Sequence, residues 1–73
     1  MANRESHIDL HRMVLRGRAV EAYTGIPASS RHRAIAEGSF PKPIPLGRRS
    51  VGWLVSELDA WLAARVEQRR KGK

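Results

Sequence analysis

The chain has 73 residues, enough for one small hydrophobic core but not for a second lobe that could close over a substrate. Its 14 Lys and Arg side chains against 7 Asp and Glu give a formal charge of +7, so a polyanion is the expected partner. Eleven of the basic residues are Arg, which favours bidentate contacts to phosphates and guanine edges. Cysteine is absent, which excludes disulfides and thiolate metal sites and fits a reducing compartment.

The sequence contains no run that approaches the ~20 apolar residues of a membrane span. Its first residues also lack the apolar stretch of a secretion signal. We therefore expect a cytoplasmic, nucleoid-associated protein with no membrane partner. A solvated charged surface would account for some of the basic residues, but not for the whole imbalance of charge.

Composition divides the chain into three parts. Residues 1–12 are polar, with Ile8 and Leu10 as their large apolar side chains, and are predicted to form a flexible N-terminal arm. Residues 13–68 are predicted to form the folded domain. Residues 69–73 are predicted to form a basic C-terminal tail that frays into solvent.

Two short helices are predicted at the start of the folded domain. Residues 18–24 carry apolar side chains three positions apart, and Gly25 can cap the C-terminus of that helix. Residues 28–37 are good helix formers between Pro27, which suits a first helical turn, and Gly38. The two helices are expected to meet across a turn of three or four residues.

A β-hairpin is predicted in the middle of the chain. Proline occupies every second position from 41 to 45, so this segment cannot be helical and must be extended. Apolar residues alternate before and after a turn at residues 47–49, which is the pattern of two paired strands. Since Pro43 and Pro45 donate no backbone hydrogen bond, their strand is expected at an edge.

A third helix is predicted from Ser56, because Ser56 and Asp59 have the spacing of a capping box. Its apolar stripe consists of Leu58, Trp61, Leu62 and Val66. We interpret Trp61, like Trp53 on the hairpin, as a core residue rather than as a stacking platform for single-stranded bases. The predicted fold is mainly α, with three helices and a small two-stranded hairpin.

The order and spacing of several short segments resemble the AlpA family of phage regulatory proteins and small excisionases. These segments are Thr-Gly-Ile at 24–26, Ser-Ser-Arg-His-Arg at 29–33, Glu-Gly-Ser-Phe-Pro at 37–41, Pro-Ile-Pro-Leu-Gly at 43–47, Val-Gly-Trp at 51–53 and Ser-Glu-Leu-Asp-Ala-Trp-Leu at 56–62. The resemblance implies a MerR-like winged helix-turn-helix. The sequence departs from the family pattern at Pro27, Arg31 and His32, where a serine, an apolar residue and a tyrosine are common, so the DNA sequence that is read cannot be carried over.

The resemblance also implies a function on the DNA of a mobile genetic element. One role is that of an excisionase, or recombination directionality factor, which bends attachment-site DNA and steers a site-specific integrase toward excision. The other is that of a transcription regulator that binds a promoter. Either role is expected to need a cooperative homo-oligomer on double-stranded DNA, because one small module reads few bases.

The second predicted helix is the expected recognition helix. Its candidate contacts to base edges and groove walls are Ser29, Ser30, Arg31, His32 and Arg33. Arg33 is the first choice, whereas Arg31 could instead fold back onto the protein. The alternative is that all five residues belong to a solvated helix face.

The hairpin is expected to act as the wing, a basic loop that follows phosphates or enters the minor groove. Arg48 and Arg49 lie at its predicted tip and Lys42 at its base. A solvated turn is the alternative for these residues. Arg16 and Arg18, beside the first helix, are candidates for backbone contacts or are ordinary surface arginines.

Other chemistry finds little support in the sequence. His7 and His11 could share a metal only if their segment were helical, and no carboxylate or thiol completes a ligand set nearby. No residues have the spacing of an acid–base pair or of a nucleophilic triad. We therefore expect no enzymatic activity, no cofactor and no metal.

Two further hypotheses remain. The protein could be an adaptor whose basic arms bind an acidic protein while an exposed Trp61 docks into a groove. RNA binding is the third hypothesis, which the scarcity of solvent-facing aromatic residues does not favour.

Overall fold

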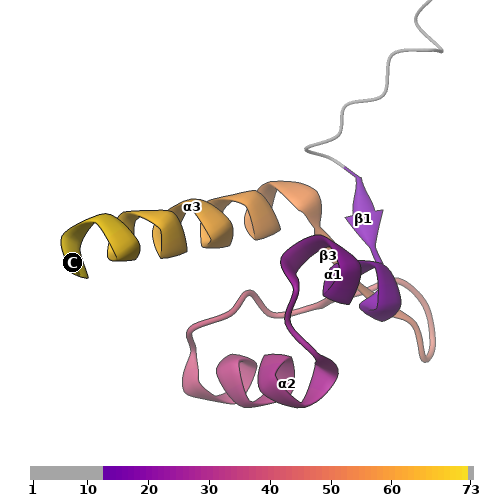
Figure 1. Cartoon of the computed structure of the whole chain (residues 1–73). Helices are drawn as coiled ribbons and strands as arrows, with labels where there is room; N and C mark the ends of the chain where they lie inside the picture. The colour runs from indigo at the N-terminus through magenta and orange to yellow at the C-terminus, as the bar shows by residue number, and fades with distance from the viewer. Residues whose placement is uncertain (1–12, 73) are drawn as a thin grey trace, which may run out of the picture.

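The computed structural model describes residues 13–72 (Figure 1). The elements, in chain order, are β1 (Val14–Leu15), α1 (Gly17–Thr24), α2 (Ala28–Glu37), β2 (Ile44–Pro45), β3 (Val51–Leu54) and α3 (Val55–Gly72). Three helices and a small antiparallel sheet make the predicted winged helix-turn-helix. The proposed N-terminal arm, residues 1–12, lies outside the described residues, as does Lys73.

The sheet has three strands in the order β1-β3-β2, one more than the predicted hairpin. Both pairings are antiparallel: Ile44 lies opposite Gly52 in the hairpin, and Leu15 lies opposite Trp53 on the other side. Pro45 lies in β2 and Pro43 directly before it, and β2 is an edge strand, as predicted, because a missing N–H group would break a central ladder. β1 has two residues and therefore no alternation pattern that could predict it.

The helix-turn-helix forms where it is predicted, with three residues between α1 and α2. Gly25 ends α1 with a φ of 81°, and its N–H donates to the Glu21 carbonyl oxygen at 2.7 Å. Gly38 ends α2 with a φ of 83°, and its N–H donates to the Ile35 carbonyl oxygen at 3.0 Å. Glycine adopts this left-handed conformation without a steric penalty, so both C-terminal caps follow from the sequence.

The core lies between the sheet and the helices. Its buried members are Val20, Phe40, Trp53 and Leu58, with Leu15, Ile26, Ala34, Ile35 and Trp61 packed around them. The Trp53 side chain is 3 % exposed, and its Nε1–H donates to the Pro41 carbonyl oxygen at 2.9 Å. Trp61 is only partly buried, with its ring edge against Phe40 at a centroid distance of 5.0 Å. Both tryptophans therefore pack against the core, with Trp61 nearer its edge.

α3 is longer than predicted at both ends. It begins at Val55, whose N–H donates to the Met13 carbonyl oxygen at 2.9 Å, and continues to Gly72. The expectation that the tail frays is wrong for residues 69–72, which are helical. Basic side chains in the last turn favour this, because they interact with the negative end of the helix dipole.

The apolar stripe of α3 contacts the core only in the first half of the helix. Leu58 is fully buried, whereas Val66 is 46 % exposed, contrary to its predicted place in the stripe. Figure 1 shows the C-terminal half of α3 projecting beyond the other described elements, which agrees with the exposure of Val66. The length of the helix therefore exceeds the length of the core.

A hydrogen bond joins α1 to α3 at the surface. The Tyr23 hydroxyl donates to Asp59 Oδ1 at 2.5 Å. This hydrogen bond, together with desolvation and the negative charge of Asp59, raises the pKa of Tyr23 above its ordinary value. All three effects disfavour a phenolate beside a carboxylate.

This contact predicts a loss of stability in alkali. Because the pKa of Tyr23 is higher in the folded chain, its contribution is fully present below the unfolded pKa of about 10. It is lost as the pH rises through the folded pKa. Tyr23 is the only tyrosine, so phenolate absorbance reports its titration directly.

The matched variant is Asp59→Asn, which removes the carboxylate charge beside the phenol. We expect its Tyr23 midpoint to lie lower than that of the wild type. Denaturant unfolding of Tyr23→Phe should show a smaller loss of stability above pH ~10 than the wild type. Equal midpoints in the wild type and Asp59→Asn would contradict the contact.

Candidate nucleic-acid interface

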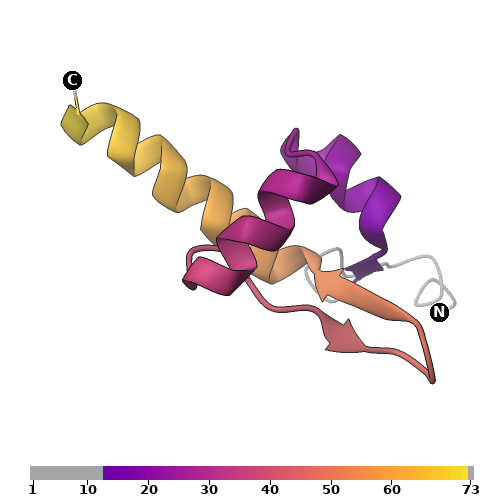
Figure 2. The ribbon, with the colours of Figure 1, turned by 90° about the horizontal axis from the view of Figure 1, so that it is seen from below.

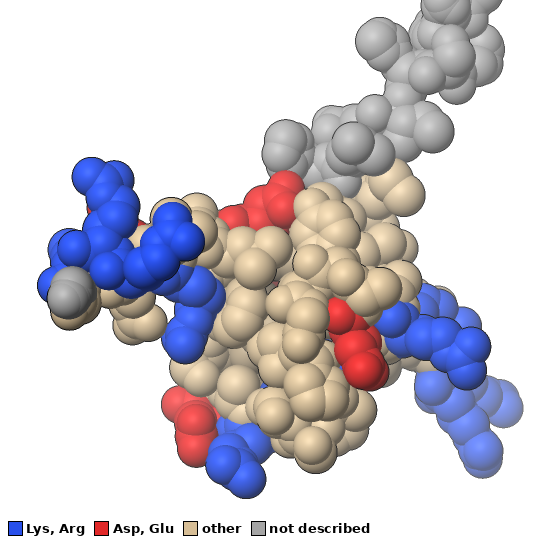
Figure 3. Space-filling model, in the orientation of Figure 1, with Lys and Arg blue, Asp and Glu red and all other residues tan. Residues whose placement is uncertain are grey.

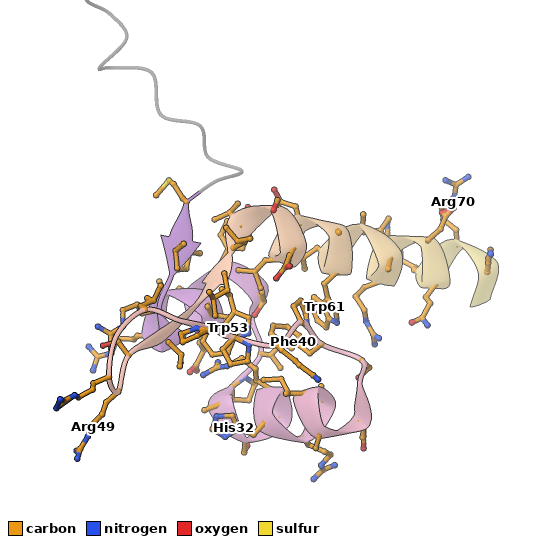
Figure 4. The ribbon with its side chains drawn as sticks, turned by 180° about the vertical axis from the view of Figure 1, so that it is seen from behind. His32, Phe40, Arg49, Trp53, Trp61 and Arg70 are labelled. Atoms are coloured by element: carbon orange, nitrogen blue, oxygen red, sulfur yellow. The ribbon has the colours of Figure 1, made fainter. Side chains whose placement is uncertain are left out.

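The first turns of α2 present four exposed side chains. These are Ser29, Ser30, His32 and Arg33, all among the predicted recognition residues. Figure 4 shows His32 pointing away from the core and from α3. The opposite side of α2 carries Ala34 and Ile35, which pack against the core and hold the exposed side outward.

Arg31 does not join this exposed group. Its side chain is 5 % exposed, and its guanidinium carbon lies 5.1 Å from the centroid of the Trp53 ring. Arg31 is three and four residues before Ala34 and Ile35, so it shares their inward side of the helix. The sequence left open that Arg31 could fold back onto the protein, and the structure places it there.

The N-terminus of α2 is open to an anion. Pro27 precedes the helix in an extended conformation and supplies no side-chain hydrogen bond to the first N–H groups. The first turn carries no acidic residue. These N–H groups and the positive end of the helix dipole favour a phosphate at this position.

The wing is a short, closed loop with basic residues at its tip. The Leu46 N–H donates to the Ser50 carbonyl oxygen at 2.7 Å, which closes the turn between β2 and β3. Arg48 and Arg49 are exposed in this turn, and Lys42 is exposed before β2. Arg49 points outward from the tip, on the side of the molecule that also carries His32 (Figure 4). Figure 2, seen from below, shows α2 and the wing together on this side.

The remaining basic residues divide between two regions of the surface. In Figure 3 the Lys and Arg side chains gather over the far end of α3 and on the side of the wing. Arg16 and Arg18 are exposed around the start of α1. Arg70 points away from α2 and forms an ion pair with Glu67 at 3.6 Å.

Two residues without a predicted role contact groups near this surface. The Arg65 guanidinium carbon lies 5.4 Å from the centroid of the Trp61 ring. Gly17, the first residue of α1, lies beside the guanidinium of Arg31. Arg65 lies four positions after Trp61 on α3, so helical spacing alone brings these two side chains together. The contact between Gly17 and Arg31 joins two helices and therefore depends on the tertiary fold.

The described residues lack the features of an enclosed ligand site or a metal site. Residues 13–72 contain no pocket and no group of three side chains that could hold a metal ion. His7 and His11, the histidine pair of the sequence, lie outside these residues. No helix between residues 13 and 72 is both long and apolar enough to cross a membrane.

Comparison with known proteins identifies the family. Residues 13–66 match the model of the family described as the prophage CP4-57 regulatory protein (AlpA). The chain is also 40 % identical over 48 residues to a protein of Enterobacteria phage P4 described as "Uncharacterized protein ORF88". That match covers 66 % of this chain and 54 % of the phage P4 protein, so it spans about half the length of this relative. No solved structure matches the chain. Since the family match runs from β1 into the second half of α3, this protein belongs to the AlpA family of phage regulatory proteins.

Proposed function

We propose that this protein binds specific sites on double-stranded DNA of a mobile genetic element. The observation that carries the proposal is the exposed first half of α2, next to a wing with two arginines at its tip. An α-helix fits the major groove, where each base pair presents a distinct pattern of donors and acceptors. A net charge of +7 adds attraction to any phosphate backbone.

The two elements have separate tasks in this proposal. Arg33 reads a guanine through two parallel hydrogen bonds, while Ser29, Ser30 and His32 contact base edges and the wall of the groove. Arg48 and Arg49 follow the backbone or a narrow minor groove, and Lys42 contacts a phosphate at the base of the wing. Arg16 and Arg18 add backbone contacts at the start of α1.

The proposed biological role is that of an excisionase. Several copies would bind side by side at an attachment site, bend the DNA and direct a site-specific integrase toward excision. The second candidate is a transcription regulator at a promoter, which the description of the family as regulatory favours. The two roles use the same surface and differ in where the DNA sites lie.

The adaptor hypothesis has weaker support. It required an exposed Trp61 that could dock into a partner. Instead, the Trp61 Nε1–H donates to the Ser39 carbonyl oxygen at 2.7 Å, and its ring packs against Phe40. These two contacts hold the ring against the protein.

The test is a titration of the full chain into duplexes that tile its gene neighbourhood and any flanking attachment site. It uses two salt concentrations and random DNA as competitor. We expect discrete sites and stepwise band shifts, beside an attachment site for an excisionase or beside a promoter for a regulator. Equal, salt-sensitive binding to all duplexes would contradict sequence-specific recognition and place the adaptor hypothesis ahead of it.

A further inference from the structure

Arg31 is a buried cation, and two of its donor atoms are unpaired within the described part of the chain. Its Nε and Nη1 atoms are buried and have no hydrogen-bond partner among the described residues. The Trp53 ring stacks on the guanidinium but accepts no conventional hydrogen bond from it. Burying a charge without hydrogen bonds is costly, so a partner for this guanidinium would stabilise the folded chain.

The guanidinium of Arg31 extends from α2 to the first residue of α1. Its Nη2 atom lies 3.3 Å from the position that a Cβ atom would take on Gly17. Glycine is a poor helix former, and Gly17 has no positive φ. Backbone conformation therefore does not explain why a glycine occupies this position. The missing side chain instead allows Nη2 to lie close to the first turn of α1, where a Cβ atom would make a tight contact with it.

The N-terminus of α1 lacks a side-chain cap among the described residues. Arg16 precedes the helix and makes no side-chain capping hydrogen bond, and the first turn contains no acidic residue. The first N–H groups of a helix have no partner within it, and the positive end of the helix dipole attracts anions. Arg16 and Arg18 add two exposed positive charges around the same turn.

We propose that a phosphate of the DNA backbone binds at the N-terminus of α1, between its first N–H groups and the guanidinium of Arg31. This inference rests on the proposed function, because it assumes that double-stranded DNA is the ligand. One phosphate thereby accepts hydrogen bonds from both helices of the helix-turn-helix. Arg31 belongs to α2, so this contact fixes the position of the recognition helix relative to the backbone without reading a base.

Gly17→Ala is the sharpest test, because it places a methyl group against Nη2 of Arg31 beside the proposed phosphate site and changes no charge. The probe is the tightest-binding duplex of the tiling series, prepared with one neutral methylphosphonate at each backbone position in turn. For the wild type we expect one position near α1 at which the neutral group weakens binding about tenfold, the effect of one charge-assisted hydrogen bond. Gly17→Ala should bind the unmodified duplex about tenfold more weakly and lose the sensitivity at that position.

Arg31→Gln is the second variant, and Arg33→Gln is its matched control on the exposed side of α2. Arg31→Gln should lose the same phosphate sensitivity and lower the slope of log affinity against log salt by about 1. Arg33→Gln should keep the sensitivity. Circular dichroism tests whether Arg31→Gln folds. If Arg31→Gln does not fold, Gly17→Ala alone tests whether a phosphate binds at this position.

The possible outcomes distinguish failure of this inference from failure of the proposed function. If the wild type binds specific duplexes but Gly17→Ala and the folded Arg31→Gln keep every phosphate sensitivity, Arg31 has only a packing role and the inference is wrong. The proposed function would then stand. If the wild type binds no duplex in preference to random DNA, the proposed function is wrong, and the inference that depends on it is wrong as well.

Discussion

Replacing Leu58 by alanine is expected to lower the free energy of unfolding by about 2–5 kcal/mol. Leu58 is fully buried in the cluster that includes Val20, Phe40 and Trp53, so its truncation removes apolar contacts and leaves a cavity. At roughly 0.05–0.15 kcal/mol per residue, a domain of 73 residues has a total stability of about 4–11 kcal/mol. Denaturant unfolding, followed by tryptophan fluorescence, should therefore show a domain near the limit of folding.

Val66→Ala is the control for this result, because Val66 lies on the same helix but is half exposed. Its effect should stay within about 0.5 kcal/mol, as for most surface substitutions. A loss of stability as large as that of Leu58→Ala would mean that the second half of α3 packs against something in solution. That result would contradict the arrangement described above.

The second large effect is expected on DNA binding, from the wing. The double substitution Arg48→Ala and Arg49→Ala should weaken binding to specific and random duplexes alike. If each arginine neutralises one phosphate, the slope of log affinity against log salt falls by about 2. Fluorescence anisotropy at several salt concentrations measures both quantities.

Arg33→Ala is the comparison that separates the two elements. Loss of a bidentate contact to guanine should cost about 1–3 kcal/mol on the specific site and much less on random DNA. The ratio of specific to random affinity should therefore fall for Arg33→Ala and remain nearly unchanged for the wing variant. Equal losses on both DNAs for both variants would contradict the division between reading and positioning.

The sequence by itself determined the parts of the fold that depend on a few neighbouring residues. Gly25 and Gly38 end their helices because glycine adopts a positive φ at little cost. Prolines confine β2 to an edge because they lack an N–H. The four exposed residues that are proposed to contact DNA also follow locally, once α2 is placed between Pro27 and Gly38.

The tertiary structure alone decided which surfaces become covered. β1 exists because Leu15 lies opposite Trp53, a pairing between residues far apart in the chain. Arg31 is buried because α1 and Trp53 pack against the inner side of α2. Val66 is exposed because α3 extends beyond the core. Helix caps and strand breaks act within a few residues, whereas burial depends on which elements meet when the whole chain packs.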